Sequence, residues 1–592
     1  VLEAAAIYKE ILAKPFDFTV DESITTDSKK KNFPANEAER RESWRKYLKY
    51  LTLQRFVDFQ ESRDKNIGKE GAVNKTDAEF EKEAREKVLT AMNRTFEYYR
   101  LKLTEDEKFN RYVNTITNMM DPHTEFMPPV DKRYFDEALS GTFFGIGAQL
   151  TYEDGNIKIA SVIPGSPAHK SGQVETGDFI VRVAQNKDSA VELAGFAVED
   201  AVKLIRGKKG TEVTLTLRKK DGQLKPVTLV RDKIIQDEVF VRSAIINEGT
   251  SKIGYIFLPE FYADFNNPNE PRSGLDVARE VIKLKQEKVD GIVIDLRNNG
   301  GGALYDVVQI AGLFVDRGPI VQIKDRQGAP QVMSDRDPGV VYDGPLVIMV
   351  NQMSASASEI LAAAMQDYGR GIVIGSSSTY GKGTVQRPIG LDPESNFMNT
   401  NSELGSLKLT LQKFYRINGG STQMKGVESD IVIPDYLEHL KIREKENPNA
   451  LAWDEIKKAD YKKVQTSYDK ETIKRLAAAR IASDSIFRAI EEKSRIIAKQ
   501  NDKNYSLKLD KFKQDQKEMR EVMKEIEKLV KLQNAMQIAF LQQDEKRYYS
   551  EDKDKTERYK AWLNNVSKDI YVDQAVKVIN DIVSQQNIAK AK

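Results

Sequence analysis

Two residues of this chain could carry out covalent chemistry together: Ser356 and Lys382, in the segment from residue 351 to 386. A serine hydroxyl is a poor nucleophile until a base takes its proton. The chain has only three histidines to act as a conventional base, and none is close to this segment in the sequence: His123, His169 and His439. A lysine can serve instead if burial lowers its pKa from about 10.4 toward the working pH. This makes Ser356 the candidate nucleophile and Lys382 the candidate general base.

Ser356 lies where a predicted strand meets a predicted helix. PLVIMVN (345–351) is typical of a buried strand, and SASASEILAAAMQDYG (354–369) is typical of a helix. A nucleophile at such a junction is exposed, and the free N–H groups of the helix start can hold a developing oxyanion. This motif alone leaves an alternative open, because Ser356 and Glu359 also match a capping box, in which the hydroxyl only caps the helix.

Lys382 lies in STYGKGTVQ (378–386), between two glycines that let the backbone bend and direct the amine inward. The segment superficially resembles a phosphate-binding loop. Five residues separate Gly375 from Gly381, however, and Gly383 follows the lysine where that motif needs Ser or Thr. The sequence therefore argues against nucleotide binding. The amide of Gln386 could orient the lysine amine.

Two further features flank this pair. Asp367 lies eleven residues after Ser356, about 16 Å further along a helix, so it cannot complete a triad and should brace neighbouring backbone or a side chain. DLRNNGGGAL (295–304) follows a buried strand, and its three consecutive glycines allow backbone N–H groups to approach a substrate. A tight turn without function is the alternative for this glycine run.

Four regions position these residues. Residues 1–140 have helical spacing of apolar residues, and residues 141–234 are short strands with one helical stretch, 198–205. Residues 235–436 alternate continuous apolar strands with helices, which indicates an α/β core covered on both faces. Residues 437–592 have the composition of long helices, as in the segment 513–543, and contain no glycine.

Composition excludes several classes of function. The 92 basic and 90 acidic residues give a formal net charge of +2, so no global field attracts nucleic acid or an anionic bilayer. The chain has no cysteine, which excludes thiol catalysis and thiolate metal sites. No apolar run reaches the roughly 18 residues that a transmembrane segment needs. Because the chain begins at Val1, we expect that a leader or further sequence has been removed.

Seven short motifs occur in order along residues 121 to 434: DPHTEFMPP (121–129), FFGIGAQL (143–150), SVIPGSPAHKSGQVETGDFIVRV (161–183), DLRNNGGG (295–302), SASASEILAAAMQDYGR (354–370), YGKGTVQ (380–386) and GVESDIVIP (426–434). Together they resemble the C-terminal processing peptidases, and within them the tail-specific protease subclass. The helical ends match that subclass in arrangement more than in motif. Any one motif would be weak, but seven in order outweigh the capping-box interpretation of Ser356.

The resemblance implies a multidomain α+β protein: a helical N-terminal domain (1–140), a PDZ domain (141–234), a crotonase-like α/β serine protease core (235–436) and a helical C-terminal domain (437–592). It implies that Ser356 is the nucleophile, Lys382 the general base, and Gln386 the residue that positions the lysine. Lys382 lies 26 residues after Ser356, one more than the family spacing, so we expect an extra loop residue in SSST (376–379).

By the same resemblance, the amide of Ala357 and that of Gly301 or Gly302 form the oxyanion hole. In the PDZ domain the backbone amides of a short loop would hold the terminal carboxylate of a ligand. For that turn alone a β-bulge would be commoner. The loop residues are Phe144, Gly145, Ile146 and Gly147.

The resulting hypothesis is an endopeptidase without metal, nucleotide or other cofactor, which acts on polypeptides with accessible C-terminal tails. The resemblance also implies export to the periplasm and a possible lipoprotein adaptor docked to the helical ends. Two alternatives remain. One is a PDZ-based peptide-binding scaffold without proteolytic activity. The other is an acyl-CoA enzyme of the crotonase type, against which the PDZ-like insertion and the Ser/Lys pair argue.

Overall fold

A computed structural model describes residues 2–66, 75–153, 156–185, 189–193, 196–235, 239–265, 267, 269–392, 404–501, 504–549 and 553–591. The chain forms two compact units. The first contains Val1–Tyr112 and Ala489–Leu529, and the second contains Val113–Arg488 and Val530–Lys592. The sequence region 437–592 is thus divided between both units, and the division into four domains stays a prediction. Helices α4 (Glu105–Met120) and α12 (Ser485–Asn501) contain the unit boundaries.

The first unit is helical, with α1 (Leu2–Leu12), α2 (Glu37–Asn66), α3 (Asp77–Glu97) and α13 (Leu509–Leu529). Helix α3 begins with a capping box, in which Glu79 accepts from the Thr76 backbone N–H at 2.7 Å. Strand β1 (Ser23–Ile24) pairs with β21 (Tyr505–Ser506). Buried aromatic rings from both chain segments pack together, among them Phe18, Phe56, Phe80 and Phe512.

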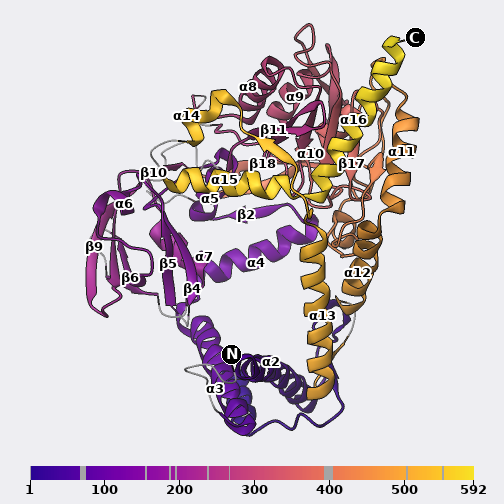
Figure 1. The fold of residues 1–592 in the computed structure, drawn as a ribbon. Coiled ribbons are helices and arrows are strands. Elements are labelled where there is room, and N and C mark those ends of the chain that lie inside the picture. Colours follow the sequence, from indigo (N-terminus) through magenta and orange to yellow (C-terminus); the bar gives the residue numbers. More distant parts are fainter. Residues whose placement is uncertain are drawn as a thin grey trace. The chain divides into compact units, whose positions relative to one another are not determined.

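The second unit is built on a seven-stranded sheet of order β20-β17-β16-β13-β12-β11-β22. Figure 1 labels β11 and β17 of this sheet. The five strands from β12 to β20 run parallel. At one edge, β11 pairs antiparallel with β12, and β22 pairs antiparallel with β11. The strands are β11 (Arg242–Glu248), β12 (Ser251–Phe257), β13 (Gly291–Asp295), β16 (Leu346–Val350), β17 (Ile372–Gly375), β20 (Ile431–Val432) and β22 (Gln537–Ala539).

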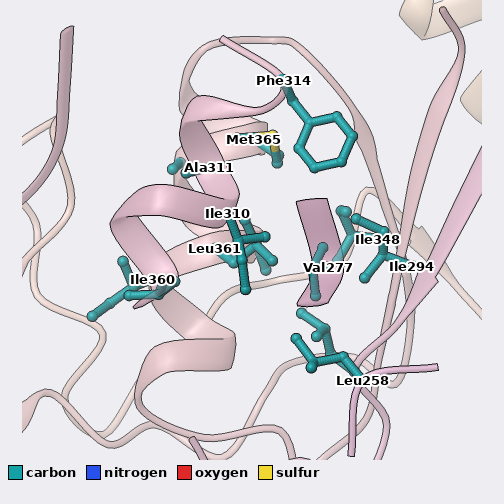
Figure 2. Close-up of a cluster of buried hydrophobic side chains, with 14 of the residues drawn as sticks. Leu258, Val277, Ile294, Ile310, Ala311, Phe314, Ile348, Ile360, Leu361 and Met365 are labelled. Atoms are coloured by element: carbon teal, nitrogen blue, oxygen red, sulfur yellow. The ribbon is translucent and has the colours of Figure 1, made fainter. Parts of the chain in front are cut away.

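Helices cover both faces of this sheet, which explains its continuous apolar strands. An added Cβ at Gly254 would meet Leu284 of α8 (Ser273–Gln286), whereas one at Gly291 would meet Ile579 of α16 (Ile570–Ala591). Gly291 pairs with Ile253, the neighbour of Gly254, so the two glycines face opposite sides. Helices α9 (Leu304–Gly312) and α10 (Ala357–Asp367) join α8 in one buried cluster with the strands (Figure 2).

A second sheet carries the lysine segment. Its strand order is β15-β14-β19-β18, and β2 also pairs with β19. The short strand β2 brings residues just after position 120 beside Ser406–Lys408 of β19. Its strands are β2 (Glu125–Met127), β14 (Gly318–Asp325), β15 (Gln331–Asp335), β18 (Thr384–Gly390) and β19 (Ser406–Tyr415).

A third sheet, with its own buried core, forms the region predicted as a PDZ domain. Its order is β4-β5-β6-β8-β9, and β7 also pairs with β6. Helix α7 (Val198–Ile205) has the bounds that the sequence predicts. Helix α6 (Pro167–Ser171) also lies in this region, and α5 (Pro129–Ser140) precedes it. The strands of the third sheet are β4 (Ala148–Glu153), β5 (Asn156–Val162), β6 (Phe179–Gln185), β7 (Val191–Glu192), β8 (Glu212–Arg218) and β9 (Leu224–Val230). A separate two-stranded sheet pairs β3 (Thr142–Gly145) with β10 (Asp232–Ile235).

The C-terminal region differs from the long helix expected over 513–543. Helix α13 ends at Leu529, and Gln537–Ala539 form β22, which pairs with β11 of the core sheet. Helix-forming composition is a weak preference, and pairing with an open sheet edge overrides it here. The other helices are α11 (Lys470–Ser483), α14 (Glu545–Tyr548) and α15 (Lys553–Ser567). No helix in the described ranges is long and apolar enough to cross a membrane.

Candidate active site

Ser356 has an unusual backbone conformation at the junction between β16 and α10. Its φ is 55° and its ψ is −110°. Residues other than glycine rarely adopt a positive φ, because this backbone conformation is strained for them. The strain persists only where the surrounding structure enforces it. The Ser356 carbonyl accepts the N–H of Ile360 at 3.0 Å, so the residue already caps the first turn of α10. The strained turn sets the serine apart from the regular helix that follows.

Glu359 connects the serine and lysine segments. This fully buried carboxylate accepts the N–H of Ser356 at 2.8 Å, as in a capping box, and also the N–H of Lys382 at 2.9 Å. It accepts two more hydrogen bonds, from the N–H of Gly381 at 2.8 Å and the hydroxyl of Thr379 at 2.6 Å. Burial raises the pKa of Glu359 to about 7 against the opposite effect of these donors. In the sequence, the spacing of Ser356 and Glu359 indicates only a helix cap.

Lys382 is partly buried, and desolvation lowers the pKa of its amine to about 8. Lys408 on β19 lowers the pKa further, while the carboxylates of Glu444, Glu359 and Asp121 raise it. An amine with this pKa is partly uncharged in mildly alkaline solution, as a general base must be. Within the described ranges, the amine of Lys382 and the hydroxyl of Ser356 form no hydrogen bond with each other. Catalytic hydrogen bonds often tighten only when substrate is bound.

The glycine run lies directly against the serine. Gly301 has a φ of 110°, and an added Cβ would come within 2.8 Å of the Ser356 Cβ and 3.1 Å of the Ala357 nitrogen. The N–H of Gly301 donates to Asn299 Oδ1 at 2.9 Å. The backbone N–H groups of Gly300, Gly302 and Ala357 donate to no acceptor in the described part of the chain. Two of the three glycines therefore have amides available to an oxyanion.

The other two residues predicted near this site contact neither Ser356 nor Lys382 through a hydrogen bond in the described chain. The amide of Gln386 donates to the hydroxyls of Thr384 at 2.9 Å and Thr410 at 3.0 Å. Asp367 accepts from Arg416 Nε at 3.0 Å and Asn418 Nδ2 at 2.9 Å. Asp367 thus braces the turn that follows β19.

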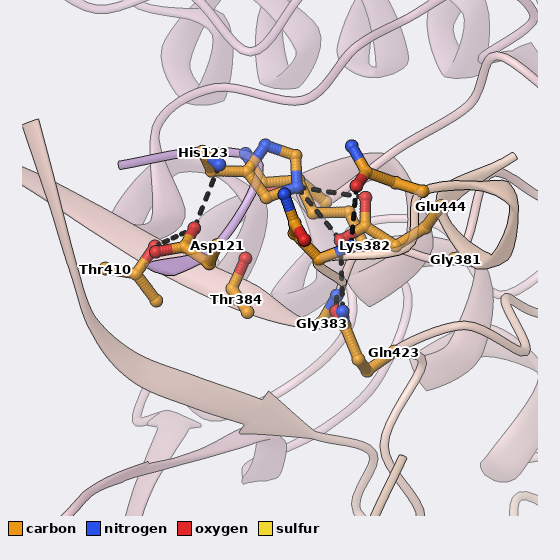
Figure 3. A network of polar contacts seen from close by, with 12 residues as sticks. Asp121, His123, Gly381, Lys382, Gly383, Thr384, Thr410, Gln423 and Glu444 are labelled. Carbon is orange, nitrogen blue, oxygen red and sulfur yellow. Dashed lines mark hydrogen bonds and ion pairs between the residues drawn. The ribbon is translucent and has the colours of Figure 1, made fainter. Parts of the chain in front are cut away.

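His123 is distant from Lys382 in the sequence but lies beside its turn in the structure. Figure 3 shows His123, Glu444 and Gln423 gathered at Gly381–Gly383. His123 Nε2 lies 2.9 Å from Glu444 Oε2, and Gln423 Nε2 donates to Glu444 Oε1 at 3.0 Å. No local sequence pattern marks Glu444 or Gln423 as functional residues, so neither was predictable from the sequence.

The segment predicted to bind a terminal carboxylate, Phe144–Gly147, contains the end of β3 and the two residues before β4. The carbonyls of Ile146 and Gly147 accept N–H groups from Ala168 and Ile163, each at 2.8 Å. The N–H groups of Ile146 and Gly147 donate to no acceptor within the described residues. A cavity of about 510 Å³ opens beside Phe144. Its lining includes charged residues of both signs: Arg133, Glu137, Lys208, Lys209, Asp264 and Glu270.

Four family models match the chain in succession. They are described as the tail specific protease N-terminal domain (residues 1–130), the PDZ domain (137–218), peptidase family S41 (252–433) and the C-terminal domain of tail specific protease (437–584).

Curated relatives are similar over more than half of the chain. The tail-specific protease of Haemophilus influenzae is 39% identical over 407 residues, which cover 68% of this chain and 57% of that protein. The carboxy-terminal-processing protease of Bartonella bacilliformis is 32% identical, covering 57% of this chain and 72% of that protein. A solved structure of a photosystem II D1 C-terminal processing protease has 24% identity and a TM-score of 0.33, covering 65% of this chain and 93% of that chain.

Proposed function

Since the chain belongs to peptidase family S41, we propose that it is a serine endopeptidase that engages polypeptides at their C-terminal ends and cleaves them with Ser356 and Lys382. The observation that carries this proposal is the shared carboxylate of Glu359, which fixes the backbones of both residues to one point. Ser356 comes from the junction between β16 and α10, and Lys382 comes from the turn before β18. The contacts with Glu359 fix the position of one segment relative to the other.

In the proposed reaction, the uncharged amine of Lys382 takes the proton of the Ser356 hydroxyl as the oxygen attacks a peptide carbonyl. The carbonyl oxygen becomes an oxyanion, which the amides of Ala357 and Gly302 would hold. The Lys382 ammonium then gives its proton to the leaving amine, and an acyl-enzyme on Ser356 remains. Lys382 next takes a proton from a water molecule as its oxygen attacks the ester. The Lys382 ammonium returns that proton to the Ser356 oxygen as the ester bond breaks, which releases the new C-terminus and restores the serine hydroxyl and the neutral amine.

Substrate capture is assigned to the PDZ domain. The free amides of Ile146 and Gly147 are suited to a terminal carboxylate, and the peptide would add as a strand beside them. Only an accessible and flexible tail can reach such a groove, so the proposed substrates are polypeptides with unstructured C-terminal ends. Following the family resemblance, the proposed compartment is the periplasm, and the proposed helper is a lipoprotein adaptor.

The test is cleavage of an unfolded polypeptide made in two versions, one with an apolar and one with a charged C-terminus. The wild-type protein should cut the apolar-ended version faster, and mass spectrometry should find fragments. Ser356→Ala and Lys382→Ala should both be inactive while still binding the tail. Binding without cleavage by the wild type would instead support the peptide-binding scaffold. Equal cleavage by all three proteins would reveal a contaminating protease and remove the support for the proposal.

A further inference from the structure

A second carboxylate network, separate from that of Glu359, also contacts the turn of Lys382. Its centre is Glu444, which is 1% exposed and lies in a short 3-10 turn, Glu444–Glu446. Glu444 is outside the matched peptidase segment, and His123 lies within the matched N-terminal segment. Segments separated by 321 positions thus meet at the turn that carries the proposed base.

The contacts of Glu444 bracket Lys382 along the chain. The Glu444 N–H donates to the carbonyl of Tyr380 at 3.0 Å, two residues before the lysine. Its carboxylate accepts from Gln423, whose Oε1 accepts the N–H of Gly383 at 2.7 Å, one residue after the lysine. Any displacement of Glu444 would therefore shift the backbone on both sides of Lys382.

The charges around the amine come from every element packed against the turn. Lys408 lies on β19, Glu359 on α10 and Asp121 before β2, and all three act on the pKa of Lys382 together with Glu444. Tyr380 faces Glu444, and His123 pairs with it. The Glu444 carboxylate favours the ammonium form of Lys382, while a donor on that carboxylate offsets part of its charge.

We propose that Glu444, held by His123, is a positioning residue for Lys382, which fixes the turn through Tyr380 and Gly383 and sets the pH range over which the amine is uncharged. This inference rests on the proposed function, in which Lys382 is the base. It gives a role in the site to residues 121–123 and to Glu444, which lie outside the matched peptidase segment 252–433.

The first test compares Glu444→Gln with the exposed control Glu455→Gln. The isosteric amide removes the negative charge, so the acid limb of the kcat/KM profile should move to lower pH by about 1 unit. Replacing His123 by Phe removes the donor from Glu444, so the same limb should move to higher pH. The conservative Glu444→Asp variant should restore the wild-type midpoint in part. The control should keep the wild-type profile.

A second readout does not need cleavage. In the Ser356→Ala background, competitive labelling with acetic anhydride across a pH series gives the titration midpoint of Lys382 by mass spectrometry. Opposite displacements of this midpoint in Glu444→Gln and His123→Phe would support the inference. Unchanged midpoints in folded variants would overturn it, whatever the cleavage assay shows. If the wild type cleaves nothing, the proposed function fails, and the labelling result still decides whether Glu444 governs Lys382.

Discussion

The backbone N–H groups of Ser356 and Lys382 donate to the same atom, Oε2 of Glu359, at 2.8 and 2.9 Å. This relationship joins a strained turn before α10 to a glycine-flanked turn before β18. The position of the proposed nucleophile relative to the proposed base therefore depends on one buried carboxylate rather than on a contact between their side chains.

Replacing Glu359 by Gln should lower kcat/KM by roughly 10- to 100-fold, because an amide offers one oxygen where four donors now share two. The amide nitrogen of the glutamine would face donors, and it cannot accept a hydrogen bond from them. Steady-state kinetics on a fluorogenic peptide would measure the loss, with circular dichroism to verify folding. The exposed Glu455→Gln variant is the control. Wild-type activity in a folded Glu359→Gln protein would show that the shared carboxylate is dispensable.

Activity should rise with pH through about 8, because the pKa of Lys382 is lowered to about 8 and only the uncharged amine can take the serine proton. The measurement is kcat/KM between pH 6 and 10 at constant ionic strength. A profile that is flat across pH 8, or that falls there, would exclude Lys382 as the base.

The free energy of unfolding should also depend on the titration of Lys382, and it should increase as the pH rises above 8. The folded-state pKa of Lys382 lies below its unfolded value of 10.5, so folding is penalised below the folded pKa, and the penalty disappears as pH rises toward 10.5. Replacing Lys382 by Met removes that penalty. We expect the variant to be more stable at pH 6 to 7 by roughly 1 to 3 kcal/mol, with the gain shrinking above pH 8. Denaturant unfolding at several pH values would measure it, and a gain that is constant with pH would contradict the assignment.

Replacing Gly301 by Ala should abolish cleavage. The added Cβ would lie 2.8 Å from the Ser356 Cβ, and the φ of 110° is unfavourable for alanine. Gly339→Ala is the matched control: its φ is 91°, and an added Cβ meets nothing within 4 Å. The control should lose about 1 kcal/mol of stability and keep its activity. Equal effects of the two substitutions would show that backbone strain, rather than contact with Ser356, matters at Gly301.

Tail binding should depend on Gly147, because an added Cβ would lie 2.1 Å from the Ser166 Cβ and force the proposed carboxylate loop to move. We expect Gly147→Ala to weaken binding of a labelled C-terminal peptide by at least about tenfold, measured by fluorescence polarisation. Gly172→Ala, whose added Cβ meets nothing within 4 Å, should bind normally. Normal binding by Gly147→Ala would remove the loop from the proposed capture site.

Local sequence patterns predicted the elements that carry the site. The strand expected at 345–351 is observed as Leu346–Val350, and the helix expected after it begins at Ala357. The four family models also confirm the predicted combination of an N-terminal domain, a PDZ domain, a protease core and a C-terminal domain. Apolar periodicity and glycine positions depend on near neighbours, so the sequence retains this information.

Contacts between distant segments were not predictable in the same way. Nothing in the sequence near His123 or Glu444 indicates that the two residues meet. Their contact depends on the short strand that follows His123 and on the 3-10 turn that begins at Glu444. Composition predicts a helix where the structure has the strand Gln537–Ala539, because the pairing of this segment with β11 determines its conformation and leaves no local pattern.

The pairing of β22 with β11 also bears on how the protein folds. Strand β11 precedes its outer partner by nearly three hundred residues, so it stays an open edge until that distant segment is available to pair with it. An unpaired edge invites association with other nascent chains. Completion of this sheet edge therefore depends on a contact between segments that are far apart in the sequence, and a chaperone that shields β11 would have its greatest effect before that contact forms.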